Sequence, residues 1–172
     1  MSTHASVYPS LVHNVLRFIL ISLLTAAPAA GQTKEEDDKT AVLATVQAFF
    51  DTMASRDVDG ARRGLMPEVR IFSARDQERQ TAVRASAVED YLKSLGAGKQ
   101  DNRERIWNPE VRVHGPIASV WTPYDFWVDR TFSHCGIDIF DLVKTAEGWK
   151  ISGLTYTVER TGCAPSPLGP LK

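Results

Sequence analysis

The residues best suited to acid–base chemistry lie in the C-terminal part of the sequence. His134 lies between Asp125 and Asp138, and Glu159 follows further along the chain. A carboxylate beside a histidine can raise the pKa of the imidazole and orient the ring as a general base. The alternative is a set of cross-strand ion pairs on the surface, each contributing less than about 1 kcal/mol. The sequence leaves both interpretations open.

Aromatic residues form a second candidate set. Their rings can wall a pocket for an apolar molecule, and their hydroxyl groups can hydrogen-bond a few polar groups on it. The alternative is an ordinary hydrophobic core with tyrosine hydroxyls reaching its rim. The candidate lining residues are Tyr91, Trp107, Tyr124, Phe126 and Tyr156.

Several other kinds of site are not indicated. His114 and His134 are too far apart for a recognisable metal motif. No serine stands in a G-x-S-x-G setting, and there is no glycine-rich phosphate loop. A net charge of −1 gives no electrostatic case for nucleic-acid binding. We therefore expect no metal, no cofactor and no nucleic-acid partner.

The N-terminal segment 1–31 is predicted to be a signal peptide. Arg17 precedes the apolar run FILISLLTAAPAA, which ends in small residues and permits cleavage near Gly31. The alternative, a membrane anchor, needs about 20 apolar residues, and this run is shorter and contains Pro28. We expect export to the periplasm or the extracellular space, with no membrane span in the mature chain.

The two cysteines gain significance from this prediction. An oxidising compartment favours a disulfide between Cys135 and Cys163, which would stabilise the fold by roughly 3–4 kcal/mol. The alternative is two buried thiols.

The elements that must position these residues can be read from periodicity. Segment 32–39 is charged and is expected to be a linker, and segment 161–172 is a Pro-rich, irregular tail. One face of a first helix is indicated by the spacing of Val42, Val46, Phe49, Phe50 and Met53. Asp57 is expected to cap a short second helix, and Ser86 with Glu89 matches a capping box for a third. The later segments 103–114, 117–128, 133–143 and 149–159 are expected to be strands.

Helices followed by an antiparallel meander make an α+β layout. The stretches FFDTMASRDVDGARRGL and HCGIDIFDLVKTAEGWKISGLTYTVER resemble the nuclear transport factor 2-like superfamily, in particular its exported, SnoaL-like and ketosteroid-isomerase-like bacterial members. The resemblance covers about residues 40–160. It implies a cone-shaped fold in which about three N-terminal helices pack on a curved antiparallel sheet, with a pocket between them.

Tight turns between the strands predict a register. Asp125 then faces His134, Tyr124 faces Cys135, and Asp138 faces Thr155. The inner, helix-covered face would carry Trp107, Val111, Val113, Val120, Thr122, Tyr124, Phe126, Ile137, Ile139, Leu154, Tyr156 and Val158. The outer face would carry Asp125, His134, Asp138, Thr155, Thr157 and Glu159 with Trp121, Trp127, Phe140, Trp149 and Ile151. A slip of one residue would exchange the faces of a strand.

Three functions follow from this layout. The first is an exported protein that binds a small apolar or aromatic molecule in the cone. The second is a lyase or isomerase with His134 as general base, aided by Asp125 or Asp138. The third is a homodimeric assembly module that pairs through Trp121, Trp127, Phe140 and Trp149.

The resemblance itself argues against the second function in two respects. The steroid isomerases of the superfamily use a tyrosine of the first helix with pocket aspartates, and this sequence has Phe49 and Phe50 in that region. The dehydratases use a pair of pocket histidines, and here only His134 is suitably placed.

Overall fold

The computed structural model describes residues 30–77 and 80–171, which form three helices and seven strands. The helices are α1 (Ala30–Ser55), α2 (Val58–Gly64) and α3 (Val88–Ala97). The strands are β1 (Leu65–Gln77), β2 (Gln80–Ala87), β3 (Asn102–Ile106), β4 (Glu110–His114), β5 (Ile117–Val128), β6 (Thr131–Thr145) and β7 (Gly148–Thr157). The predicted α+β class and helix-on-sheet architecture are confirmed.

The seven strands form one mixed sheet in the order β2-β1-β7-β6-β5-β3, with β4 pairing β5 beside β3. Every pair is antiparallel except β1 with β7, which is parallel. The expected antiparallel pairing therefore holds for every pair but this one. Parallel neighbours need a long crossover, and here the chain from β2 to β6 supplies it.

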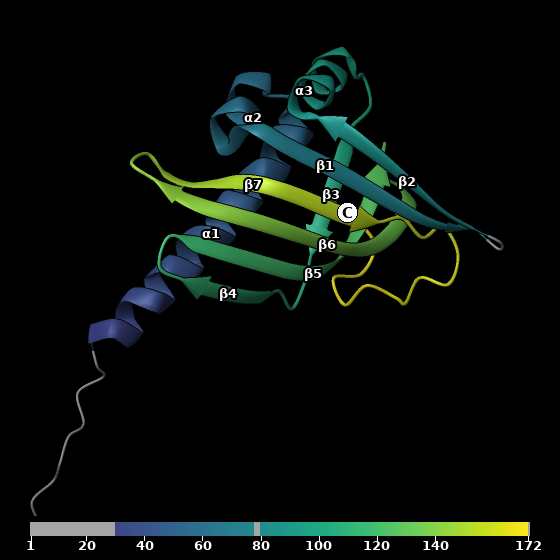
Figure 1. Ribbon diagram of the computed structural model, residues 1–172. Coiled ribbons are helices and arrows are strands. Elements are labelled where there is room, and N and C mark those ends of the chain that lie inside the picture. Colours follow the sequence, from purple (N-terminus) through teal and green to yellow (C-terminus); the bar gives the residue numbers. More distant parts are fainter. Residues whose placement is uncertain (1–29, 78–79, 172) are drawn as a thin grey trace, which may run out of the picture.

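The helices cover one face of this sheet. In Figure 1, α1 runs behind the strands while α2 and α3 lie at one end. Phe49 and Phe50 of α1 pack against Phe140 of β6, with ring centroids 6.1 and 5.7 Å apart. Val42 and Val46 are fully buried on the same helix face. The predicted apolar stripe is therefore the contact between α1 and the sheet.

The segment 32–39 is helical and forms part of α1, so the expected linker was wrong. Lys39 pairs with Glu35 and Glu36 one turn earlier, at 2.9 and 3.1 Å. Asp38 is buried where it accepts a hydrogen bond from Lys144 and another from the Trp149 indole at 3.4 Å. The hydrogen bond from Lys144 lowers the pKa of Asp38. These contacts fasten the charged segment to the sheet.

The two helix caps have different outcomes. Asp57 caps α2 as predicted, accepting a hydrogen bond from the Gly60 amide at 2.8 Å. The capping box at α3 does not form, because Ser86 lies in β2 opposite Ile71 and Ala87 occupies the cap position. Glu89 instead pairs with Arg62 of α2.

Two β-bulges overturn the predicted register. Phe126 pairs with His134 and Trp127 pairs with Phe132, which leaves Ser133 as an extra residue in β6. Asp141 pairs with Gly153 and Leu142 with Ile151, so Ser152 is extra in β7. Each bulge shifts one strand by a single residue and exchanges its faces. Asp125 consequently faces Cys135, Tyr124 faces Gly136, and Asp138 faces Tyr156.

The shift redistributes the side chains that were assigned to the two faces. His134, Asp138, Phe140, Trp149 and Ile151 move to the inner, helix-covered face, whereas Ile137 and Ile139 move to the outer face. The burial of Phe140, at 0% exposure, and of Trp149, at 7%, agrees with this placement.

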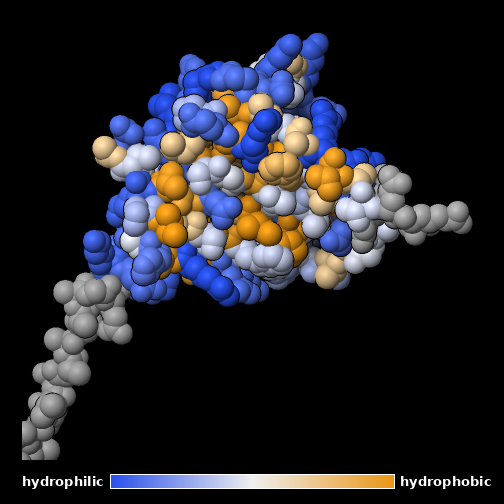
Figure 2. Space-filling view, in the orientation of Figure 1, coloured by the Kyte–Doolittle hydropathy of each residue, from blue (hydrophilic) through white to orange (hydrophobic). Residues whose placement is uncertain are grey.

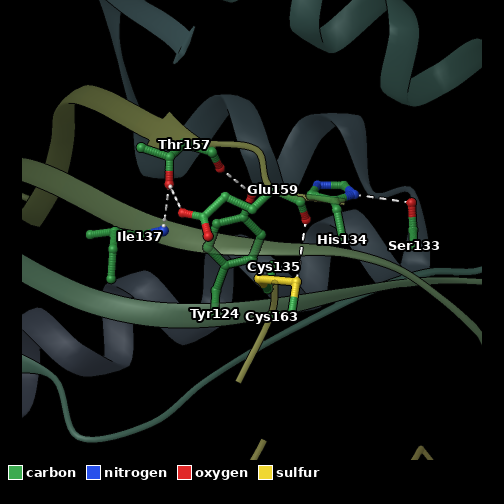
Figure 3. Close-up of a disulfide and its surroundings, with 8 residues drawn as sticks. All are labelled: Tyr124, Ser133, His134, Cys135, Ile137, Thr157, Glu159 and Cys163. Atoms are coloured by element: carbon green, nitrogen blue, oxygen red, sulfur yellow. Dashed lines mark hydrogen bonds between the residues drawn. A yellow bond between two sulfur atoms is a disulfide. The ribbon is translucent and has the colours of Figure 1, made fainter. Parts of the chain in front are cut away.

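The expected disulfide is present. Cys135 and Cys163 are bonded, with Cα atoms 6.0 Å apart. The bond, drawn in Figure 3, holds the tail against the outer face of the sheet. Arg105 also donates to the Gly169 carbonyl in the tail, at 2.7 Å. The tail is irregular over residues 160–171, as expected.

The predicted signal peptide lies almost wholly outside the described residues. Within the part of the chain that the structure describes, no helix has both the length and the apolar character needed to cross a membrane.

Gly136 is a position where the packing requires glycine. A Cβ atom there would lie 2.3 Å from the Thr157 carbonyl oxygen and 2.8 Å from the Tyr124 ring. We expect Gly136→Ala to lower the free energy of unfolding by about 2 kcal/mol or more, as overpacked cores do. Urea denaturation of both proteins measures the change.

Gly153→Ala is the matched control, because its Cβ atom would meet nothing closer than 3.4 Å. It should change stability by less than about 0.5 kcal/mol. Equal effects of the two substitutions would contradict the packing account.

Candidate functional site

A cavity of about 250 Å³ lies between the helices and the inner face of the sheet. The expected aromatic residues Tyr91, Tyr124, Phe126 and Tyr156 all line it. Tyr91 comes from α3, and the other three come from β5 and β7. The remaining lining residues are Phe49, Met53, Ile71, Ser94, Leu95, Asn102, Glu104, His134, Asp138 and Leu154.

Trp107 does not line this cavity, contrary to expectation. It lies in the break between β3 and β4 and contributes to a groove under the C-terminal tail. Asn108, the next residue, has a φ of 47°, which changes the direction of the chain. Because of this break, Ile106 rather than Trp107 pairs with Tyr124 of β5.

Asp125 and His134 lie on opposite faces of the sheet, so the predicted carboxylate–histidine pair does not form. Asp125 is 2% exposed on the outer side, where it accepts hydrogen bonds from Arg105 at 2.8 and 2.6 Å. It also accepts one from the Trp127 indole at 2.9 Å. These contacts give Asp125 a structural role beneath the tail.

Asp138 lies in the cavity wall and forms a carboxyl pair with Glu104. Asp138 is 1% exposed, and the two side chains are hydrogen-bonded. Burial raises the pKa of Asp138 to about 7 and raises the pKa of Glu104 well above its usual value. Near neutral pH the pair therefore holds a proton that two exposed carboxylates would have lost.

His134 also faces the cavity, and its surroundings make it a weak base. Burial and the nearby Arg160 and Arg75 lower its pKa to about 4, the opposite direction from the one expected. Its ring stacks on Phe126 at 4.8 Å, and its Nδ1 lies 3.0 Å from the Ser133 hydroxyl. Figure 3 shows the imidazole and the Cys135 sulfur leaving β6 on opposite sides. At neutral pH His134 is an uncharged, polar wall of the cavity.

Three buried polar atoms in this cavity have no partner among the described residues. They are the Tyr91 hydroxyl, Asn102 Oδ1 and Asp138 Oδ2, and they are all the unpartnered buried side-chain atoms in that part of the chain. The Tyr124 hydroxyl, in contrast, donates to the Thr157 carbonyl at 2.6 Å. Buried polar groups are rarely left unpaired, and each costs about 1–3 kcal/mol. Their shared location is therefore informative.

Residues 37–157 match the protein family described as "Putative lumazine-binding". The match covers well over half of the sequence. The chain belongs to this family.

No curated protein matches the sequence of this family member. Solved structures resemble it at low identity. A nuclear transport factor 2-like protein with a cystatin-like fold from Novosphingobium aromaticivorans has a TM-score of 0.59 and 13% identity, covering 78% of this chain and 90% of its own. A protein of unknown function from Nostoc punctiforme, also with a cystatin-like fold, has a TM-score of 0.58 and 12% identity, covering 76% and 95%. These likenesses establish the nuclear transport factor 2-like fold that the sequence suggested.

Sequence reasoning missed Glu104 and Asn102. The pattern Asn-Arg-Glu-Arg-Ile alternates, and the two arginines would suit the outer face. The alternation from the inner-facing Val111 and Val113, when continued back across Pro109, placed Glu104 on the outer face instead. Because the chain breaks at residues 107–109, the alternation in β4 does not determine which side chains of β3 face the cavity.

The surface expected for a homodimer is not continuous. Phe140 and Trp149 are buried in the core, and Trp127 lies under the Arg105 guanidinium, which is 5.2 Å from its ring centroid. Trp121, at 48% exposure, is the one strongly exposed residue of the four. Hydrophobic residues appear in separate groups between hydrophilic ones in the view of Figure 2.

Among the described residues, no group of histidine, cysteine, aspartate or glutamate side chains is arranged to hold a metal ion.

The carboxyl pair makes stability in this family member depend on pH. Because the pKa of Asp138 is raised on folding, the folded state retains a proton that the unfolded chain loses between about pH 4 and 7, and stability falls over that range. Replacing Asp138 with asparagine removes this loss. We expect Asp138→Asn to gain stability relative to the original protein as the pH rises from 4 to 7.5, measured by urea denaturation at each pH.

His134 contributes in the opposite direction, since its lowered pKa makes stability rise between about pH 4 and 6.5. Comparing variant with original protein at each pH cancels this contribution. The control is Asp141→Asn, which changes an exposed aspartate on the same strand. Its free energy of unfolding, plotted against pH, should run parallel to that of the original protein. If the plot for Asp138→Asn is parallel as well, the raised pKa of Asp138 is contradicted.

Proposed function

We propose that the protein binds a small, planar heteroaromatic molecule in the cavity between its helices and its sheet. The observation that carries this proposal is the convergence of three unpartnered buried polar atoms on one cavity. A ligand with matching groups would satisfy all three at once and remove the cost of leaving them unpaired.

The walls favour a flat aromatic ring. Tyr91 stacks on Phe49 with centroids 5.5 Å apart, and Tyr124 and Tyr156 meet edge to face at 6.4 Å. Such walls supply apolar area with fixed geometry. A volume of about 250 Å³ is small for a ligand site and suits a molecule of two fused rings rather than a steroid.

The polar atoms favour a ligand rich in N–H groups. Asn102 Oδ1 and Asp138 Oδ2 are acceptors, and the Tyr91 hydroxyl can donate or accept. A pteridine with ring N–H and carbonyl groups offers this complement, and lumazine is one. The family description is consistent with such a ligand.

The proposal includes export. The apolar run at residues 18–30 favours a signal peptide, and the bond between Cys135 and Cys163 suits an oxidising compartment. The protein would then collect or carry its ligand outside the cytoplasm.

The Tyr91 hydroxyl gives a sharp test. Since this hydroxyl has no partner, Tyr91→Phe should leave the free energy of unfolding unchanged or slightly higher. The same variant should bind lumazine roughly three- to tenfold more weakly, because one hydrogen bond to the ligand is lost. Isothermal titration calorimetry with lumazine measures the affinity.

Tyr124→Phe is the matched control. Its hydroxyl already bonds to the Thr157 carbonyl, so this variant should lose about 1 kcal/mol of stability and keep its affinity. The proposal fails if the original protein binds no lumazine, or if Tyr91→Phe binds it as tightly as the original.

The carboxyl pair favours a second candidate, proton transfer to and from the bound molecule. A carboxyl group with a pKa near 7 suits general acid–base catalysis at neutral pH. In this reading Asp138, with Glu104, takes the place of the His134 and Asp125 pair as the acid–base group. Asp138 would accept a proton from a carbon of the ligand and return it to the same carbon.

Deuterium exchange tests this candidate. The methyl protons of 6,7-dimethyllumazine, which lie next to ring C=N bonds, are weakly acidic, and their exchange in D₂O can be followed by proton NMR. We expect the protein to accelerate exchange and Asp138→Asn to lose at least a hundredfold of that acceleration. An exchange rate unaffected by the protein would leave binding as the function.

A further inference from the structure

His134 and two arginines lie together where the inner face of the sheet extends beyond the cavity. Cys135 and Glu159 form an antiparallel bridge, with N–O distances of 3.0 and 2.9 Å. Continuing this pairing by one residue would place His134 and Arg160 opposite each other on one face. Arg160 acts electrostatically on His134, which faces the cavity, so we place Arg160 at the end of the inner face.

Arg75 reaches the same place from β1. Ser73 stands beside Tyr156, and the Val158 amide donates to the Ala74 carbonyl at 2.9 Å. Arg75 follows Ser73 by two residues and so shares its inner face. Arg75 and Arg160 both line a hollow beside the cavity, and both act electrostatically on His134.

These two guanidinium groups have no ion-pair partner among the residues whose side chains the structure describes. Both arginines are exposed, and no ion pair to either is present within residues 33–75 and 81–171. Glu159 lines the same hollow, and its carboxylate accepts a hydrogen bond from the neutral Thr157 hydroxyl at 3.4 Å. Two guanidinium groups against this one carboxylate give the described lining of the hollow a net positive charge.

We propose that the ligand of the cavity carries an oxyanion group, a carboxylate or a phosphate, that binds between Arg75 and Arg160 beside His134. This inference rests on the proposed binding function. It describes a ligand with two unlike ends. The N–H groups of its ring face Asn102 and Asp138 inside the cavity, and its anionic substituent lies at the mouth, where guanidinium groups can form charge-assisted hydrogen bonds.

The test compares two probes that differ in one carboxylate, lumazine and 6-carboxylumazine. Calorimetry on the original protein should show about tenfold tighter binding of the carboxylated probe, the gain expected of a charge-assisted hydrogen bond. Arg75→Gln and Arg160→Gln should each reduce this preference, and the double variant should abolish it. Affinity for lumazine should stay unchanged in all three variants. The preference should also weaken as salt is added.

Arg112→Gln is the control, because it removes the same charge from an exposed position on β4. It should keep the full preference. Inorganic phosphate and acetate, added as competitors against 6-carboxylumazine, distinguish the two oxyanions, since the better-matched one displaces the probe at lower concentration.

The outcomes separate this inference from the function on which it rests. Equal binding of the two probes by the original protein overturns the oxyanion site and leaves the proposed function in place. A preference that survives in the double variant also overturns it. If neither probe binds, the proposed function itself is lost.

Discussion

The extra residue Ser133 in β6 is the constraint on which the rest of the site depends. With it, His134, Gly136 and Asp138 face the helices, and Cys135 faces the tail. Without it, the cavity would be walled by Ile137 and Ile139 and would be wholly apolar there. A bulge costs one ladder position and redirects an entire strand. In this fold that single insertion converts a core-like face into one that can hold polar groups, and Gly136 leaves the space that the Tyr124 ring fills.

The cavity combines groups that are costly to bury. A carboxyl pair, an uncharged histidine and three unpartnered polar atoms all lie within one small volume. Elsewhere the described core is conventional, and its buried charges are paired, as Asp125 is with Arg105 and Asp38 with Lys144. Proteins tolerate such costs chiefly where a ligand or a reaction recovers them. Buried charged groups are paired outside the cavity, whereas three buried polar atoms inside it have no hydrogen-bond partner, and this contrast supports a ligand site.

Much of the fold could be predicted from sequence, and the site only in part. The apolar spacing on α1, the Asp57 cap and most strand segments are local patterns, and they were recovered. The predicted strand 103–114 is instead divided into β3 and β4. Four of the five aromatic residues predicted to line a pocket do line the cavity. Tyr124, Phe126 and Tyr156 alternate regularly on β5 and β7, and Tyr91 lies on the predicted third helix, α3. The facing of β6 could not be predicted, since nothing in SHCGIDIF marks Ser133 as extra. Glu104 was lost for a related reason: the break at residues 107–109 resets the alternation, and only pairing with β5 shows it.

The disulfide has a consequence for experiments on this protein. Cys135 and His134 are neighbours on β6, one holding the tail on the outer side and the other forming the cavity wall. The backbone between them is shared, so the tether on one side limits how far the wall on the other side can move. Protein produced in a reducing cytoplasm would lack this tether while keeping every residue of the cavity. The redox history of a preparation therefore belongs among the controlled variables of any affinity measured with it.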